Sequence, residues 1–117
     1  MATEASFKAK YFHEETRGVW RAIEPLRAAV CFKQANLIGL NSSVAQNRFS
    51  GFDEFDVIFC RNVLMHFDDQ AAHQTLHAIY SLLRPGGYLL VGHAESLLPQ
   101  GLGFTAVQIN RELVHRK

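Results

Sequence analysis

The sequence lacks several features that mark whole classes of protein. No apolar run approaches the roughly 20 residues that a membrane-spanning helix needs. The opening MATEASFKAK has none of the apolar centre of a signal peptide. The net charge is only +1, with acidic and basic residues interspersed, so no basic surface for nucleic acid or an anionic membrane is expected. Together these absences predict a cytoplasmic protein.

Cysteine is also scarce. The 117 residues contain only Cys31 and Cys60, each within an apolar, strand-like run. Neither has the spacing of a metal motif or a disulfide framework, so we expect two buried, reduced thiols. Hydrophobic residues make up 48% of the chain and include nine Phe, which is enough for the core of one domain or part of one.

The most informative stretch runs from Phe55 to Ser96. An apolar run over 57–60 stops at Arg61, a helical pattern follows, and a second apolar run over 88–92 begins after a Pro-Gly-Gly turn. Two short apolar runs separated by a helix are typical of a βαβ unit in a parallel sheet. The predicted fold class is therefore α/β. Segments 104–109 and 113–116, on either side of Asn110-Arg111, are predicted to close it as an antiparallel hairpin.

Weaker patterns predict the remaining elements. Residues 3–17 are expected to form a helix that Gly18 stops, and residues 28–33 a strand. Residues 19–23 fit either a short strand or a turn, and residues 39–53 a surface loop with one helical turn near 44–47. The helix of the βαβ unit is expected to be capped by Asp68 or Asp69 and to bury a stripe made of Ala72, Leu76, Ile79, Tyr80 and Leu83.

Polar residues gather where the predicted strands end, which is where open α/β sheets bind ligands. Arg61 and Asn62 follow the first strand of the βαβ unit. Arg can hold a carboxylate bidentately, and Asn can both donate and accept hydrogen bonds. Spacing alone leaves a structural alternative open, in which Arg61 pairs with a nearby acid and Asn62 caps a turn. Asn36 and Leu37 have the same relation to strand 28–33, where an Asx turn is the local alternative.

His66 lies close to Asp68 and Asp69. A helix cap with a neighbouring His is favoured over a metal site, because no third ligand has a useful spacing. His73 and His77 are four residues apart, a spacing compatible with zinc. The Glu of a zinc protease is missing between them, so a solvated helix face is the favoured interpretation.

The second strand of the βαβ unit ends at Gly92, and His93 and Glu95 follow it. Alternation along an extended chain predicts that both face the same crevice, where they would form a charge-assisted pair. One further absence is informative. No Gly-rich G-x-G-x-x-G turn occurs anywhere, and no acid ends a strand in the place that would hold a ribose. These residues therefore predict half of a nucleotide-binding sheet.

Several of these motifs together resemble one family. FDVIFCRNVLMHFD (55–68) and LLRPGGYLLVGHAESL (82–97) closely resemble the chemotaxis-receptor methyltransferases of the CheR type, which are S-adenosylmethionine-dependent protein-glutamate O-methyltransferases. KYF (10–12), VCFKQANL (30–37) and the closing FTAVQINRELVHRK (104–117) are similar in the same order. The first motif is specific, whereas LLRPGG is shared by many methyltransferases. The resemblance implies S-adenosylmethionine as cofactor and a methyl-accepting chemoreceptor as substrate.

The resemblance also implies roles for particular residues. Asn36 and Leu37 would contact the adenine end of the cofactor, and Arg61 and Asn62 would line its methionine and methyl-transfer end. His66 stands where the family usually has Tyr, near the transferred methyl group, so Arg61 and His66 are the implied catalytic residues.

Family members have, upstream of the matching residues, a helical domain, the Gly-rich turn and the ribose-binding acid. We therefore expect residues 1–117 to be the C-terminal portion of the methyltransferase domain, truncated in nature or artificially. The fold would be a partial Rossmann-like sheet that lacks the first strands. Such a chain would bind cofactor weakly or not at all, and its own activity stays open. Its bare strand edge predicts a homodimer or association with a missing N-terminal half. A non-enzymatic binding or assembly module, or another methyltransferase of this fold, is the alternative.

Overall fold

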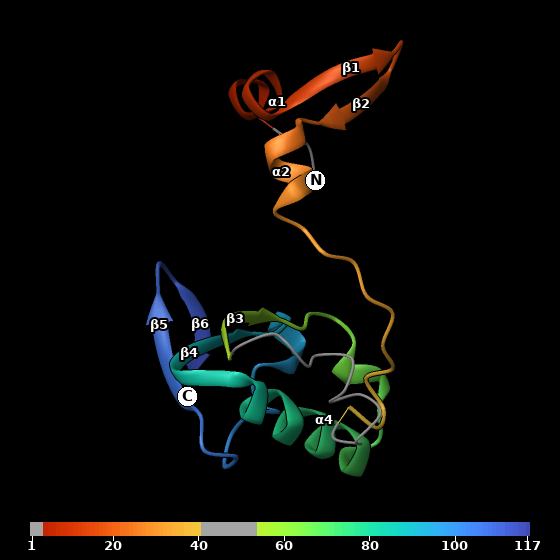
Figure 1. The fold of residues 1–117 in the computed structure, drawn as a ribbon. Coiled ribbons are helices and arrows are strands. Elements are labelled where there is room, and N and C mark those ends of the chain that lie inside the picture. The colour runs from red at the N-terminus through yellow and green to blue at the C-terminus, as the bar shows by residue number, and fades with distance from the viewer. Residues whose placement is uncertain (1–3, 41–53) are drawn as a thin grey trace. The chain divides into compact units, whose positions relative to one another are not determined.

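The computed structural model describes residues 4–40 and 54–117 (Figure 1). The chain forms two compact units, Met1–Gln34 and Ala35–Lys117, and each is described by itself. The loop predicted over residues 39–53, with its helical turn near 44–47, lies almost entirely outside the described residues. None of the helices in the described ranges combines the length and the apolarity needed to cross a bilayer.

The N-terminal unit contains two short helices and a hairpin. Helix α1 (Ala5–Tyr11) leads directly into strand β1 (Phe12–Thr16), which pairs antiparallel with β2 (Val19–Ala22), and helix α2 (Glu24–Ala28) follows. The turn contains Gly18, whose φ of 79° suits a residue without a side chain, and its amide donates to Glu14 Oε1 at 2.8 Å.

The hairpin corrects the prediction of one helix over residues 3–17. The helix ends at Tyr11, because four of the next five residues pair with Val19–Ala22 instead of continuing the helical ladder. The open choice for residues 19–23 is resolved as a strand. Propensity over so few residues is a weak preference that cross-strand pairing overrides.

The strand predicted over residues 28–33 is wrong. Residues 24–28 form α2 with Pro25 in its first turn, where Pro is well tolerated, and residues 30–36 have no regular secondary structure. Within the described ranges no strand pairs with this segment, and Phe32 is 94% exposed. Cys31 is exposed as well, so the expected burial holds for Cys60 alone.

The C-terminal unit contains the predicted βαβ unit and closing hairpin. Strand β3 (Phe55–Phe59) is followed by a 3₁₀ turn, η1 (Leu64–His66), helix α4 (Asp69–Leu82) and strand β4 (Leu83–Leu90). A second 3₁₀ turn, η2 (His93–Glu95), leads to β5 (Thr105–Ile109) and β6 (Glu112–Arg116). The sheet order is β3-β4-β6-β5, with β3 parallel to β4 and the other two pairings antiparallel. This mixed sheet confirms the α/β prediction.

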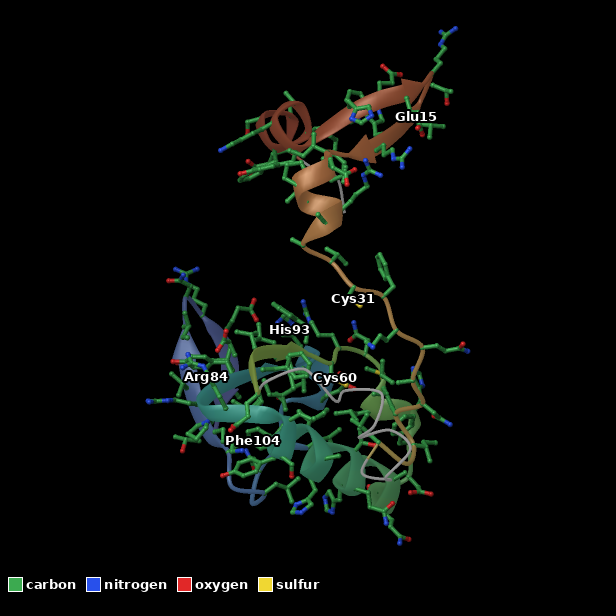
Figure 2. The ribbon with its side chains drawn as sticks, in the orientation of Figure 1. Glu15, Cys31, Cys60, Arg84, His93 and Phe104 are labelled. Carbon is green, nitrogen blue, oxygen red and sulfur yellow. The ribbon has the colours of Figure 1, made fainter. Side chains whose placement is uncertain are left out.

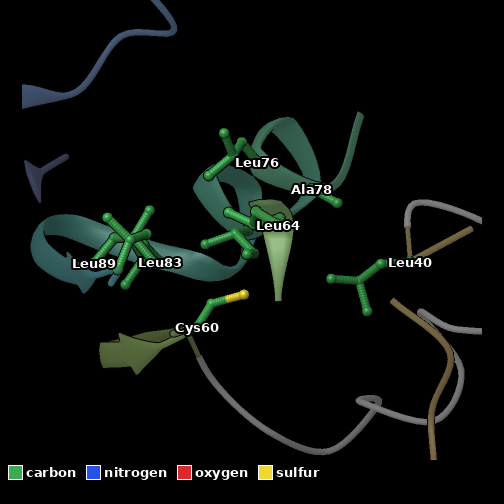
Figure 3. Close-up of a cluster of buried hydrophobic side chains, with 9 residues drawn as sticks. Leu40, Cys60, Leu64, Leu76, Ala78, Leu83 and Leu89 are labelled. Carbon is green, nitrogen blue, oxygen red and sulfur yellow. The ribbon is translucent and has the colours of Figure 1, made fainter. Parts of the chain in front are cut away.

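Helix α4 lies along one face of the sheet and supplies much of the core (Figures 1 and 3). Its N-cap is Asp68, whose Oδ1 accepts the amide of Ala71 at 2.7 Å, as one of the two predicted caps. Of the predicted stripe, Ala72, Leu76, Ile79 and Leu83 are buried, although Leu83 already belongs to β4. Tyr80 is only half-buried and packs edge-on against Phe104, the residue that Figure 2 labels.

The C-terminal end of α4 is tied to the end of the chain. Lys117 Nζ donates to the carbonyl oxygens of Tyr80 and Leu83 at 2.8 and 2.7 Å. These are carbonyls of the kind that the last turn of a helix leaves without intrahelical partners.

The predicted Pro-Gly-Gly turn becomes a bulge within β4, since pairing passes from Phe55–Leu83 to Val57–Tyr88 and skips four residues of β4.

Candidate functional site

The carboxyl ends of β3 and β4 lie side by side because the two strands are parallel neighbours. Phe59 pairs with Leu90, and the amide of Cys60 donates to the carbonyl of Leu90 at 2.9 Å. Arg61 and Asn62, which follow β3, are thereby brought to the same edge of the sheet as Gly92, which follows β4. The predicted gathering of polar residues at this edge is present.

A buried carboxylate joins the two strand ends. Glu95, in η2, is 0% exposed. Its Oε1 accepts the amides of Asn62 at 2.6 Å and Gly92 at 2.9 Å, and its Oε2 accepts the amide of Met65 at 3.0 Å. Burial alone would raise the pKa of Glu95, but these amides and that of Leu64 outweigh it and lower the pKa below the ordinary value. The carboxylate is therefore ionised and fully used as an acceptor.

The residues around Glu95 are packed closely. Asn62 has a φ of 63°, in the left-handed region that Asn tolerates better than most residues. Its side chain lies against Gly92, where an added Cβ would collide with Asn62 Oδ1 and would stand 2.9 Å from Glu95 Oε1. Gly92 is thus required for space, since its φ of −67° is open to any residue.

A pocket of about 490 Å³ opens beside β3. Its walls are apolar, and Arg61 is the only charged residue among the described residues that line it. The lining comprises Ala35, Leu37, Leu40, Phe55, Val57, Ile58, Phe59, Cys60, Arg61, Val63, Ile79 and Leu82. Burial and, secondarily, the negative charge of Glu95 raise the pKa of the Cys60 thiol. Cys60 therefore adds no charge to the lining of the pocket.

The five residues implied by the resemblance occupy different positions. Leu37 and Arg61 line the same pocket. Asn36 is exposed, and its Oδ1 accepts the amide of Ile38 at 3.1 Å, which is the Asx turn that local reasoning offered as the alternative. Asn62 and His66 are exposed and do not line the pocket. The structure brings two of the five together, and the functional roles of all five stay predictions.

The predicted pair of His93 with Glu95 is wrong. His93 Nε2 lies 2.8 Å from Glu112 Oε2 on β6, whereas Glu95 is turned inward to the amides (Figure 2 shows His93). Alternation fails because the chain enters η2 directly after Gly92. His73 and His77 are exposed on α4, which confirms the solvated face. No cluster of three metal-ligating side chains occurs within the described ranges.

Sequence reasoning missed the roles of Gly92 and Glu95. A signal was present in their spacing, because a Glu at the third position of a helical turn can bind the amide at its start, as in one half of a capping box. The bonds to Asn62 and Met65 span 33 and 30 residues and have no such local signal.

The fold and this edge define a class: a Rossmann-like α/β protein whose ligand would bind where parallel strands end. The family is shown by comparison with known proteins. Residues 2–113 match the model of the CheR methyltransferase SAM-binding domain, and the chain belongs to this family. S-adenosylmethionine (SAM) is the family's cofactor.

Individual relatives agree with this assignment. The chain is 38% identical over 88 residues to chemotaxis protein methyltransferase 2 of Vibrio cholerae, which covers 75% of this chain and 28% of that protein. It is 30% identical over 107 residues to chemotaxis protein methyltransferase 1 of Pseudomonas aeruginosa, covering 92% and 36%. The corresponding Borreliella burgdorferi protein is 32% identical over 90 residues, covering 77% and 29%. The chain thus spans about a third of the length of these relatives.

The pocket fits part of S-adenosylmethionine. Its volume lies within the roughly 300–1,000 Å³ typical of small-molecule sites, and its apolar walls suit a flat base. Arg61 is a suitable partner for the carboxylate of the methionine moiety. None of the described lining residues is acidic, so the residues that would hold the ribose hydroxyls are not among them.

Proposed function

We propose that this chain forms one wall of the site at which a SAM-dependent enzyme methylates glutamate side chains of chemoreceptors. The observation that carries the proposal is the convergence of Arg61 and Leu37 on one pocket at the carboxyl edge of the sheet, in a chain of the CheR family. The relatives' names support the methyltransferase activity and the link to chemotaxis. Glutamate as acceptor, and a cytoplasmic location, belong to the proposal.

The chemistry suits these residues. When bound, S-adenosylmethionine supplies a methyl group on a sulfonium centre. The accepting glutamate has an ordinary pKa of about 4.3 and is already ionised at neutral pH, so no strong general base is needed. The protein must align the carboxylate and exclude water, and such alignment can contribute about 7–11 kcal/mol. We assign orientation of carboxylate groups to Arg61 and exclusion of water to the apolar walls.

The remaining roles follow the family pattern. Leu37 packs on the adenine, and the amide of Asn36 reads its polar edge. Asn62 lines the methionine end beside Arg61. His66 stands near the methyl group in place of Tyr, where its ring keeps an aromatic face and a hydrogen-bonding atom. In this assignment residues 1–117 are the C-terminal portion of the methyltransferase domain.

Binding of S-adenosylhomocysteine tests the cofactor site. We expect weak affinity for the 117 residues alone, so the measurement is a heteronuclear NMR titration to millimolar ligand rather than calorimetry only. Amide shifts should concentrate at Leu37 and Arg61–Val63. Arg61→Ala should reduce the response at least tenfold, and Arg84→Ala, an exposed arginine paired with Asp56, should not. An unchanged titration curve in Arg61→Ala would remove Arg61 from the site.

The acceptor is tested separately. The complete enzyme should transfer a labelled methyl group to peptides from a chemoreceptor's methylated helices. The product should release methanol in mild alkali, as a carboxylate methyl ester does. Replacing each peptide Glu by Gln should abolish labelling, and label that survives this replacement would exclude glutamate as the acceptor.

We also propose that the isolated chain associates through β3 as a homodimer. Within the described residues β3 is paired only with β4, and its Val57 and Phe59 are 43% and 69% exposed. An apolar strand edge of this kind promotes association. Light scattering should show a dimer that Phe59→Lys dissociates, whereas Ile109→Lys, on the opposite edge strand, should leave it intact. A wild-type monomer at high concentration would contradict the proposal.

A further inference from the structure

Glu95 is the only fully buried acidic residue in the described part of the chain. No lysine, arginine or histidine of that part forms a salt bridge with it. Burial of a carboxylate is costly unless hydrogen bonds compensate. Here both oxygens are compensated by the main chain, with three amides at 2.6–3.0 Å. Among the described residues, this charge therefore holds backbone rather than pairing with another side chain.

The held backbone is the turn that contains Arg61. Two of the three amides, those of Asn62 and Met65, belong to the turn after β3, and the third is at the end of β4. Asn62 has a left-handed φ of 63°, a conformation that is uncommon for a residue other than glycine and that the contacts of its surroundings help to hold. Its amide donates the shortest of the three hydrogen bonds to Glu95. The amide of Asn62 and the carbonyl of Arg61 belong to the same planar peptide group. A hydrogen bond that holds this amide therefore also holds the orientation of the backbone at Arg61, where the chain leaves β3.

We propose that Glu95 is a positioning residue of the methyl-transfer site: its carboxylate holds the Arg61–Met65 turn in the conformation that presents Arg61 to the pocket. This inference rests on the proposed function for the role of Arg61. The geometric part, that Glu95 sets the turn, stands on the contacts alone. Glu95 acts through the main chain and has no direct contact with the reacting groups in this assignment.

The variant that isolates this role is Glu95→Gln. It keeps the size of the side chain but replaces one acceptor oxygen by an NH₂ group, which would face a backbone amide that also donates. The matched control is Lys117→Met. Lys117 also uses a charged group to hold two backbone groups, the carbonyls of Tyr80 and Leu83, but it does so at the C-terminal end of α4, away from the Arg61–Met65 turn. Both variants should lose stability, but only Glu95→Gln should disturb the turn.

The first measurement needs no ligand. Amide hydrogen exchange in Glu95→Gln should accelerate by at least about tenfold at Asn62, Met65 and Gly92, relative to the amides of the β5–β6 hairpin. The Arg61 side-chain Nε–Hε resonance should shift in the same variant. In Lys117→Met neither change should appear. Equal acceleration throughout the unit, or an unmoved Arg61 resonance, would reduce Glu95 to a structural residue and overturn the inference.

The second measurement uses S-adenosylhomocysteine. Glu95→Gln should weaken the NMR titration by about the same factor as Arg61→Ala, and the double variant should lose little more, since both changes act through one group. Additive losses would overturn positioning through Arg61. If the wild-type chain shows no response to the ligand, the proposed function fails, while the exchange and Arg61 data still decide whether Glu95 sets the turn.

Discussion

Replacing Gly92 by Ala provides a direct test of the packing at the two strand ends. The backbone of Gly92 is extended, with φ −67° and ψ 159°, so Ala introduces no conformational strain there. Any loss of stability must therefore come from the contacts of the new methyl group. That group would stand 2.9 Å from Glu95 Oε1 and 3.2 Å from Asn62 Cγ, and closer still to Asn62 Oδ1. Either the Asn62 side chain or the Glu95 carboxylate must move.

The magnitude follows from this crowding. Inserting a methyl group into a packed site costs about 1–3 kcal/mol. A domain of this size has about 5–15 kcal/mol in total, and each kcal/mol lowers the melting temperature by about 4–8 °C for a unit of 60–100 residues. Gly92→Ala should therefore melt clearly below wild type in circular dichroism. Amide exchange at Asn62 and Met65 should accelerate as Glu95 is displaced.

Gly101→Ala is the matched control. Gly101 has a φ of 77° and no atom within 4 Å of an added Cβ, so Ala there meets backbone strain of about 1–2 kcal/mol and no steric conflict. The two variants should lose similar stability, but only Gly92→Ala should change exchange at the turn after β3. A Gly92→Ala protein with wild-type melting and exchange, or equal changes at Asn62 in both variants, would refute the described packing.

Three further predictions concern the C-terminal unit. Asp68→Ala removes the N-cap of α4 and should cost about 1 kcal/mol in urea unfolding, whereas Asp68→Asn should restore most of it. Lys117→Met should destabilise α4 by about 1–3 kcal/mol, seen as faster exchange at its last turn, because two carbonyls lose a charged donor. Burial lowers the pKa of His115, whose Nε2 has no hydrogen-bond partner among residues 4–40 and 54–117, so the unfolded chain takes up a proton first as pH falls below about 6.5. Wild-type stability should fall between pH 7.5 and 5.5, and His115→Phe should flatten this dependence; an unchanged slope would contradict it.

The sequence predicts the C-terminal unit well because its signals are local and agree with one another. The apolar run over 57–60, the helical stripe with Asp68 before it and the apolar run over 88–92 each indicate one element. A parallel pair joined by a helix is almost the only way to bury all three. The closing hairpin is equally local, since Asn110 and Arg111 adopt the left-handed φ values of 48° and 68° that a tight turn between strands requires.

The N-terminal unit is predicted less well because its segments are short and each fits two structures. Residues 12–16 follow directly on a helical segment, but their pairing with Val19–Ala22 decides the outcome. Residues 28–33 have the composition of a strand, and yet a strand needs a neighbour that no described residue supplies. A pattern that depends on a partner cannot be interpreted from the segment alone.

The candidate site divides in the same way. Arg61 and Leu37 could be placed at a strand's end from local sequence and from the family resemblance, and both line the pocket. The role of Glu95 could not, because the prediction assumed that the chain stays extended after Gly92 and so aimed Glu95 at His93. The chain turns into η2 instead. Within this turn the Glu95 carboxylate points back to the strand ends, where it accepts the amides of Gly92 and Asn62. An ionised carboxylate that is buried and has no basic partner among the described residues thus has a geometric explanation: the ends of two parallel strands expose amides that need a common acceptor, and Glu95 supplies it.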